Sequence, residues 1–210
     1  MNILTRSLIN KCRKESPWNF GNKVLYDLCR KYPDHCDMSV VIAKIWLIGR
    51  AYAAAIERRK NKGGSDGDFY LKNAAPAICN SRIDDWIKNA SVYRRPSTSS
   101  ISSILSAHFN VTKLFCQISG LEKRSLASKY LHFHKPNLFY IYDRRAVAAM
   151  RRIPNFVGGL EERDRPFDDE YRKFTSRCIG LRDHIKENFG DMLNPRQLDN
   201  LLLEIHSKNA

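Results

Sequence analysis

The chain has 210 residues, enough to bury one substantial hydrophobic core. Hydrophobic residues make up 43% of it and charged residues 28%, which argues against extensive disorder. The formal net charge of +14 draws in polyanions and makes their binding depend on salt. Nucleic acid is therefore the expected partner, and a basic protein with solvated lysines is the alternative.

The sequence also argues against a membrane-spanning segment, an export signal and a metal site. No apolar run approaches the roughly 20 residues that span a bilayer, and the first residues lack the pattern of an export signal. The six cysteines include no CxxC pair, so we expect neither a zinc site nor a disulfide framework. We expect a cytoplasmic monomer without cofactors and without a membrane partner.

The first clear helical pattern runs from residue 39 to residue 60. Besides its apolar stripe, this helix has a second stripe at helical spacing that mixes an aromatic ring with opposite charges: Trp46, Arg50, Ala53 and Glu57. We interpret it as a buried central helix with a cleft on its second face; the alternative is a solvent-facing Arg50 and Glu57 with Trp46 packed on a neighbouring helix. The apolar stripe of this helix consists of Val41, Ile45, Ile48, Tyr52 and Ala55.

The middle of the chain alternates loops and helices. Residues 58–69 contain three glycines and predict a mobile surface loop. Ser81 is a candidate cap for a short helix, and the following loop carries Arg94 and Arg95, which are candidates for phosphate contacts. The serines and threonine at 97–100 favour the start of another helix, which Gly120 would end.

Later helices are marked by their caps. A helix over 125–134 should end before Pro136, with residues 137–142 extended and Asp143 capping a helix that reaches residue 152. Capping alone is a sufficient structural explanation for Asp143. Two further amphipathic helices are predicted, one before Gly190 and one after Asn194 and Pro195.

These elements predict an all-α, compact helical domain over residues 1–210. We expect two lobes around a cleft, one formed by 1–60 with 160–210 and the other by 70–155. No internal repeat is present, and 138–142 is the one segment with a strand-like pattern.

Residues 119–150 resemble the helix-hairpin-helix DNA glycosylases (HhH-GPD), in particular the 8-oxoguanine-glycosylase-like branch. Gly120, Lys123, Pro136, an apolar run and Asp143 follow one another in the order of that superfamily, although the hairpin has a single glycine. The resemblance implies that Asp143 stabilises positive charge on the sugar while the glycosidic bond breaks. Counting back from Pro136 makes Lys123 the matching lysine, and counting by the helix pattern makes it Lys129. Either lysine would attack the sugar as a neutral amine or bind phosphate.

The resemblance further implies that the target base leaves the duplex and enters a pocket. Candidates for its lining are Trp46, Arg50, Tyr52 and Glu57. Candidate DNA contacts are Arg94, Arg95, Arg124, Arg144, Arg145, His132 and His134, with a structural histidine and a solvated arginine face as the alternatives.

The expected partner is double-stranded DNA with a modified base. The substrate would be a damaged purine or a modified cytosine of bacteriophage DNA, such as glucosylated hydroxymethylcytosine, removed in antiviral defence. The alternative function is a non-catalytic nucleic-acid-binding protein. A metal-dependent nuclease is disfavoured because the acidic residues form no PD and ExK pattern.

Overall fold

The computed structural model describes residues 3–61, 63–156 and 167–208. The chain is all-helical in these ranges, as expected, and they contain no strand. The elements are α1 (Arg6–Cys12), α2 (Trp18–Lys31), α3 (Met38–Ala51), α4 (Asp66–Phe69), the π-helical turn η1 (Tyr70–Ala74), α5 (Ala75–Cys79), α6 (Ile83–Ala90), α7 (Ile101–Ser119), α8 (Arg124–His134), α9 (Arg144–Met150), α10 (Asp169–Phe189) and α11 (Pro195–Ser207).

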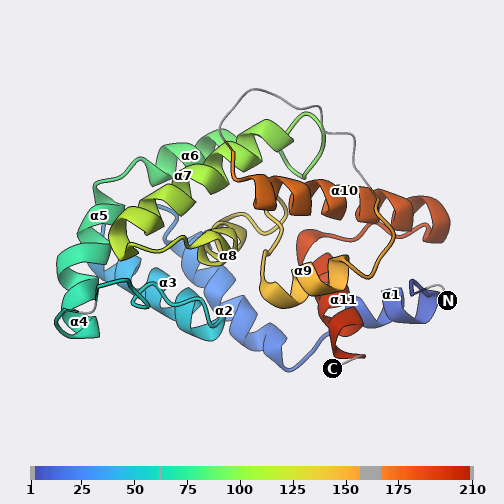
Figure 1. The fold of residues 1–210 in the computed structure, drawn as a ribbon, viewed down its shortest axis with the longest axis horizontal. Helices are drawn as coiled ribbons and strands as arrows, with labels where there is room; N and C mark the ends of the chain where they lie inside the picture. The colour runs from blue at the N-terminus through green and yellow to red at the C-terminus, as the bar shows by residue number, and fades with distance from the viewer. Residues whose placement is uncertain (1–2, 62, 157–166, 209–210) are drawn as a thin grey trace.

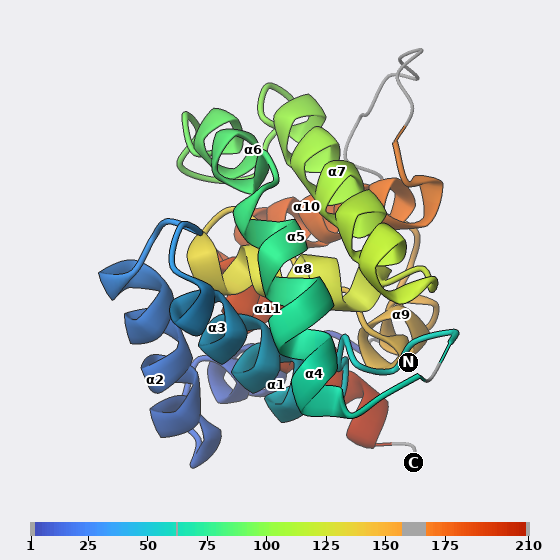
Figure 2. The same cartoon turned by 90° about the vertical axis from the view of Figure 1, so that its left-hand side faces the viewer.

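Helix α8 lies at the centre of the molecule, where α2, α3 and α7 pack against it (Figure 1). Every residue from Leu126 to Phe133 is buried, so this helix has no solvent-facing stripe. Helix α11 packs against both α1 and α9, which brings the first and last helices of the chain together. The second view shows α3, α4 and α5 on the side of α8 opposite to α10 (Figure 2).

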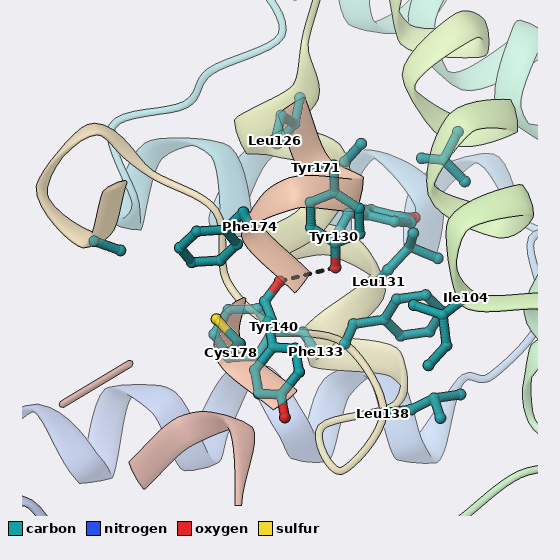
Figure 3. Close-up of a cluster of buried hydrophobic side chains, with 14 of the residues drawn as sticks. Ile104, Leu126, Tyr130, Leu131, Phe133, Leu138, Tyr140, Tyr171, Phe174 and Cys178 are labelled. Carbon is teal, nitrogen blue, oxygen red and sulfur yellow. Dashed lines mark hydrogen bonds between the residues drawn. The ribbon is translucent and has the colours of Figure 1, made fainter. Parts of the chain in front are cut away.

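The buried residues of these helices form one hydrophobic cluster. Phe115 of α7 meets the ring of Tyr130 edge-on at 5.6 Å, and Tyr171 of α10 donates a hydrogen bond to the Tyr140 carbonyl at 3.0 Å (Figure 3). Each fully buried aromatic side chain contributes on the order of 2 kcal/mol through the hydrophobic effect. A continuous core of this kind is that of one compact helical unit.

Helices from the two expected lobes are in contact with each other. Helix α9 of the 70–155 segment packs on α11, and α3 of the 1–60 segment packs on α8. The boundary proposed at residue 160 lies outside the described residues.

Four predicted helix ends are present where local sequence signals placed them. Gly120 and Gly190 end α7 and α10 in the left-handed conformation, with φ of 69° and 74°. Asp143 caps α9 by accepting a hydrogen bond from the Ala146 amide, and Asn194 caps α11 in a capping box with Gln197. Residues 135–143 connect α8 to α9, and 139–143 within this connection have no regular structure.

The prediction of a single helix over 39–60 is wrong, because α3 ends at Ala51. Ala53 has a φ of 51°, and the Ala54 amide turns back to the Gly49 carbonyl at 2.8 Å. The non-helical chain after it lacks helical hydrogen bonds, and two lysine ammonium groups replace some of them. Lys129 donates to the Tyr52 carbonyl and Lys123 to the Ala55 carbonyl. Trp46 and Glu57 therefore do not share a helix face, and the buried central helix is α8.

Two other stretches differ from expectation. The loop predicted over 58–69 is shorter, because α4 begins at Asp66, and the buried Arg59 side chain donates to the Gly63 and Gly64 carbonyls and to Asp66. Residues 66–79 are helical, with the π turn in the middle, although no helix was predicted there. Its Tyr70 hydroxyl bonds to Glu57, which fixes the preceding loop to this helix.

Candidate active site

Asp143 stands between the extended segment and α9, and its two oxygens have different surroundings. Oδ1 accepts the capping hydrogen bond of the Ala146 amide at 2.9 Å. Oδ2 lies 3.8 Å from Lys129 Nζ and 3.8 Å from a guanidinium nitrogen of Arg145. The side chain is 14% exposed, so one oxygen of this carboxylate faces cations near the surface.

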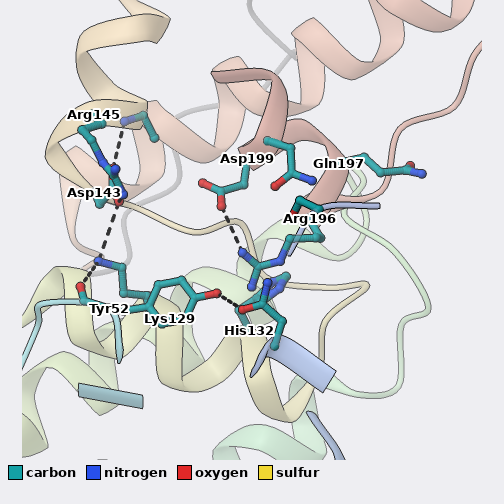
Figure 4. Close-up of polar contacts among 12 residues, drawn as sticks. Tyr52, Lys129, His132, Asp143, Arg145, Arg196, Gln197 and Asp199 are labelled. Atoms are coloured by element: carbon teal, nitrogen blue, oxygen red, sulfur yellow. Dashed lines mark hydrogen bonds and ion pairs between the residues drawn. The ribbon is translucent and has the colours of Figure 1, made fainter. Parts of the chain in front are cut away.

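Lys129 reaches this carboxylate from the buried helix α8 (Figure 4). Its ammonium group donates to the Tyr52 carbonyl at 3.1 Å and to Ser125 Oγ at 3.0 Å, and only 4% of the side chain is exposed. Burial lowers the pKa of Lys129 and Arg145 adds to that effect, whereas Asp143 and Asp199 oppose it. A lysine in these surroundings gives up its proton more readily than one in water.

Lys123 occupies a different place. It precedes α8, and its ammonium group donates to the carbonyls of Ala55 and Arg58 in the loop after α3. Burial lowers its pKa, and Glu57 opposes that effect. Of the two candidate lysines, Lys129 is the one with an ion-pair contact to Asp143.

Helix α11 supplies a second ion pair to the same region. Arg196 Nη1 lies 3.2 Å from Asp199 Oδ2, and Arg196 Nε donates to the Tyr26 hydroxyl at 2.9 Å. The Arg196 guanidinium carbon is 5.6 Å from the ring centres of Tyr52 and Phe133. Charged and aromatic groups from α2, α8, α9 and α11 therefore converge around Lys129.

The two candidate histidines are held within the protein. His132 is fully buried, with Nδ1 2.8 Å from the Phe139 carbonyl and Nε2 2.7 Å from the Tyr26 hydroxyl. His134 is half-buried, with Nδ1 against the Tyr130 carbonyl and its ring stacked on His35. His132 therefore connects α8 to α2, and His134 connects α8 to the loop between α2 and α3, which is the structural alternative for both histidines.

The candidate arginines fall into two groups. Arg124 is bound to both oxygens of Asp168, at 2.8 and 2.6 Å, and also to Glu122. The others are exposed: Arg94, Arg95, Arg144 and Arg145, of which Arg145 also lies 3.8 Å from Asp143 Oδ2.

The four pocket candidates do not all come together. Arg50 forms an ion pair with Glu57, a buried residue that also accepts a hydrogen bond from the Tyr70 hydroxyl. Tyr52 lies instead beside Lys129 and Arg196, with its hydroxyl bonded to Asn22. Trp46 is about half-exposed on α3.

The sequence interpretation missed Arg196, Asp199 and Tyr26. The sequence did contain a signal for two of them. Arg196 and Asp199 are three residues apart, as neighbours on one helix face are, and Asp199 lies next to Leu198 on the buried face of α11. A charged pair on the buried face of an amphipathic helix is rare enough to mark a site. Tyr26 carried no such signal.

The described residues show neither a cluster of metal ligands nor a membrane-spanning helix. Within 3–61, 63–156 and 167–208, no three histidine, cysteine or acidic side chains gather as metal ligands would. In the same ranges no helix combines the length and the apolar character needed to cross a membrane.

Comparison with known proteins gives a match to a family model. A family model described as the HI_0787_N N-terminal domain matches residues 4–138, whereas no curated protein and no solved structure matches the chain. The matched segment contains α1 to α8 with both candidate lysines, and it ends before Asp143 and α9 to α11. Because the match spans more than half of the residues, the chain belongs to the HI_0787_N family.

Proposed function

We propose that this protein is a DNA glycosylase that removes a modified or damaged base and leaves an abasic site. The observation that carries the proposal is the contact between Asp143 Oδ2 and the buried Lys129 Nζ, beside the exposed arginines of α9. The Asp143 carboxylate lies at the positive N-terminus of α9. A fixed negative charge of this kind is what a developing oxocarbenium sugar requires.

The reaction breaks the bond between C1′ of the sugar and a nitrogen of the base. Asp143 stabilises the positive charge on C1′, and the departing base nitrogen takes up a proton. A water molecule then bonds to C1′ and loses a proton to solvent, or neutral Lys129 attacks C1′ and forms an imine with the opened sugar. The water route needs only Asp143, whereas the amine route also needs Lys129 to be deprotonated.

The helical hairpin formed by α7, Gly120 and α8 supports the proposal, since it leads into the segment that carries Asp143. We propose that this hairpin and α9 lie along double-stranded DNA, with two lobes on either side of a flipped base. Exposed arginines would contact phosphates from the α6–α7 loop and from α9: Arg94, Arg95, Arg144 and Arg145. The base would enter beside Tyr52, whose ring lies next to both Lys129 and Arg196.

For the substrate we propose two classes. One is an oxidised or alkylated purine, and the other is a modified cytosine of bacteriophage DNA, whose removal would protect a bacterial cell. The large positive charge supports DNA as the substrate carrier without distinguishing between these bases.

The test is release of base from defined duplexes. Purified protein is incubated with DNA containing 8-oxoguanine, alkylated purines or glucosylated hydroxymethylcytosine, and abasic sites are counted. We expect activity on one of these DNAs, a loss of at least about 100-fold in Asp143→Asn, and unchanged DNA affinity and thermal unfolding in that variant. An Asp143→Asn variant as active as the parent would reject this role.

Borohydride trapping separates the two chemical routes. If Lys129 forms the imine, reduction links the protein to DNA, and Lys129→Met abolishes the link while Lys123→Met keeps it. If no link forms but base is released, water is the nucleophile and Lys129 serves only as a positioning cation for Asp143.

A binding protein without catalysis is the second candidate function. It is favoured by the capping bond of Asp143 and by the two protein acceptors already used by Lys129. In that case DNA binds with strong salt dependence, no base leaves any of the duplexes, and Asp143→Asn binds DNA as the parent does.

A further inference from the structure

Asp199 is a buried carboxylate whose hydrogen bonding is incomplete. Its side chain is 4% exposed, and Oδ2 lies against Arg196 Nη1. Oδ1 is buried without a hydrogen-bond partner among the described residues, and so is Nη2 of Arg196. An unpaired buried polar atom costs about 1–3 kcal/mol. In an ion pair that served stability alone, Arg196 Nη2 would donate a hydrogen bond to Asp199 Oδ1. Because both atoms lack a partner in the described part of the chain, the pair calls for another explanation.

The surroundings of Asp199 point towards Lys129 and Asp143. Helix α11 packs on α9, the helix that Asp143 caps, and Figure 4 shows Arg196 and Asp199 entering the same region as Lys129. Asp199 interacts electrostatically with charged or titratable groups from α2, the end of α3, α8, α9 and its cap, α10 and α11: Tyr26, Tyr52, Lys129, Asp143, Arg145, Cys178 and Arg196.

We propose that Asp199 is a positioning residue of the Lys129–Asp143 pair, whose buried negative charge, anchored by Arg196, sets the fraction of Lys129 that carries a proton. The inference rests on the proposed function, because it assigns a part to the same site. The Lys129 ammonium group has one carboxylate, that of Asp143, at 3.8 Å. Asp199 of α11 adds a second negative charge that acts on this ammonium group.

The proton affinity of Asp199 itself supports this role. Burial and, less strongly, Asp143 raise the pKa of Asp199 to about 6 against the opposing effect of Arg196. Asp199 is therefore charged at pH 8 and loses its charge as the pH falls through 6. The support that it gives to the Lys129 ammonium is lost over the same interval.

The test follows the protonation of Lys129 directly. Lysine labelled with ¹³C at Cε is incorporated into the full chain, the Lys129 signal is identified by its absence in Lys129→Met, and its chemical shift is followed from pH 6 to pH 11. In Asp199→Asn we expect the titration to move to lower pH, so that the neutral amine fraction at pH 8 rises by roughly three-fold or more.

Two further variants make the result specific. Asp191→Asn removes a carboxylate that pairs with Arg6 and Arg13 rather than with Lys129, and it should leave the Lys129 titration unchanged. Arg196→Gln removes the anchor, so Asp199 holds its proton to higher pH and Lys129 shifts in the same direction as in Asp199→Asn. Far-UV circular dichroism confirms that each variant is folded.

An unchanged Lys129 titration in folded Asp199→Asn overturns the inference, and an equal shift in Asp191→Asn does the same. Base release by the parent is measured in parallel to separate the two proposals. A shifted titration without base release from any duplex supports the coupling and rejects the glycosylase. Base release with an unchanged titration rejects the role of Asp199 and leaves the glycosylase in place.

Discussion

Asp143 shows how one residue serves folding and chemistry at once. Its Oδ1 caps α9, and its Oδ2 faces Lys129 and Arg145. The cap was predictable because an aspartate before a helical run is a local signal. The choice between Lys123 and Lys129 was not, because it depends on how the loop after α3 folds against α8. That loop supplies the carbonyls that hold Lys123 away from the Asp143 ion pair.

The arginines all contribute to the positive net charge, but some stabilise the fold and others are exposed for contact with DNA. Arg124 neutralises Asp168, whose side chain is buried and caps α10. Arg124→Gln leaves this carboxylate without its cation, and we expect the free energy of unfolding in urea to fall by about 2 kcal/mol. DNA affinity, measured where the variant is folded, should change little.

Arg144→Gln is the matched substitution on the exposed face of α9. Here we expect unchanged stability, weaker DNA binding, and a slope of log K against log salt that is smaller in magnitude by about 1. Fluorescence anisotropy at several salt concentrations measures both quantities. If Arg124→Gln weakens binding and Arg144→Gln does not, the division between buried and phosphate-binding arginines is wrong.

At the scale of elements, helix ends with local signals were predictable and those with distant causes were not. Gly120, Gly190 and Asn194 mark their ends within a few residues of sequence. The end of α3 at Ala51 contradicts a run of good helix formers. The carbonyls of the unwound chain instead accept hydrogen bonds from the buried Lys129 of α8 and from Lys123, which directly precedes α8. No signal near residue 51 reveals partners that lie far along the sequence.

The α7–α8 hairpin can be tested through its glycine. A Cβ at position 120 would lie 3.0 Å from Lys60 Cβ, whereas a Cβ at position 190 meets nothing within 4 Å. Both glycines have left-handed backbones at the ends of long helices, so Gly190→Ala is the matched control. We expect Gly190→Ala to cost about 1 kcal/mol and Gly120→Ala at least about 1 kcal/mol more, measured by urea unfolding. Equal losses would show that Lys60 yields without cost.

The contact between Lys60 and the α7–α8 hairpin also links the hairpin to the candidate site. Lys60 donates its amide hydrogen to the Ser119 carbonyl at 2.9 Å, so the hairpin and the loop after α3 are directly joined. That loop also binds Lys123 and Lys129. Displacing Lys60 should therefore lower the rate of base release by more than the loss of stability explains.

On the scale of the whole molecule, burial of titratable groups makes folding depend on pH. Burial lowers the pKa of four histidines, in the case of His108 to about 4. The unfolded chain binds their protons near pH 6.5 and the folded protein does not, so the free energy of unfolding decreases as the pH falls from 6.5 towards 4. The four are His35, His108, His132 and His134.

Asp199 acts in the opposite direction within the same interval. Its pKa is raised to about 6, so the folded protein holds this proton where the unfolded chain has lost it, and stability gained through Asp199 disappears as the pH rises from about 4 through 6. Four histidines outweigh one carboxyl group, and the net expectation is a protein that loses stability in mild acid.

Urea unfolding at pH 7.5, 6.5, 5.5 and 4.5 measures this dependence. We expect the midpoint to decrease steadily below pH 6.5, more steeply in Asp199→Asn, which lacks the opposing group, and less steeply in His108→Gln. His206→Gln, in the last turn of α11, is the control and should keep the dependence of the parent. A midpoint that is constant from pH 6.5 to pH 4.5 would mean that these histidines take up protons without unfolding, and so that the packing of α8 around His132 and His134 is looser than their contacts indicate.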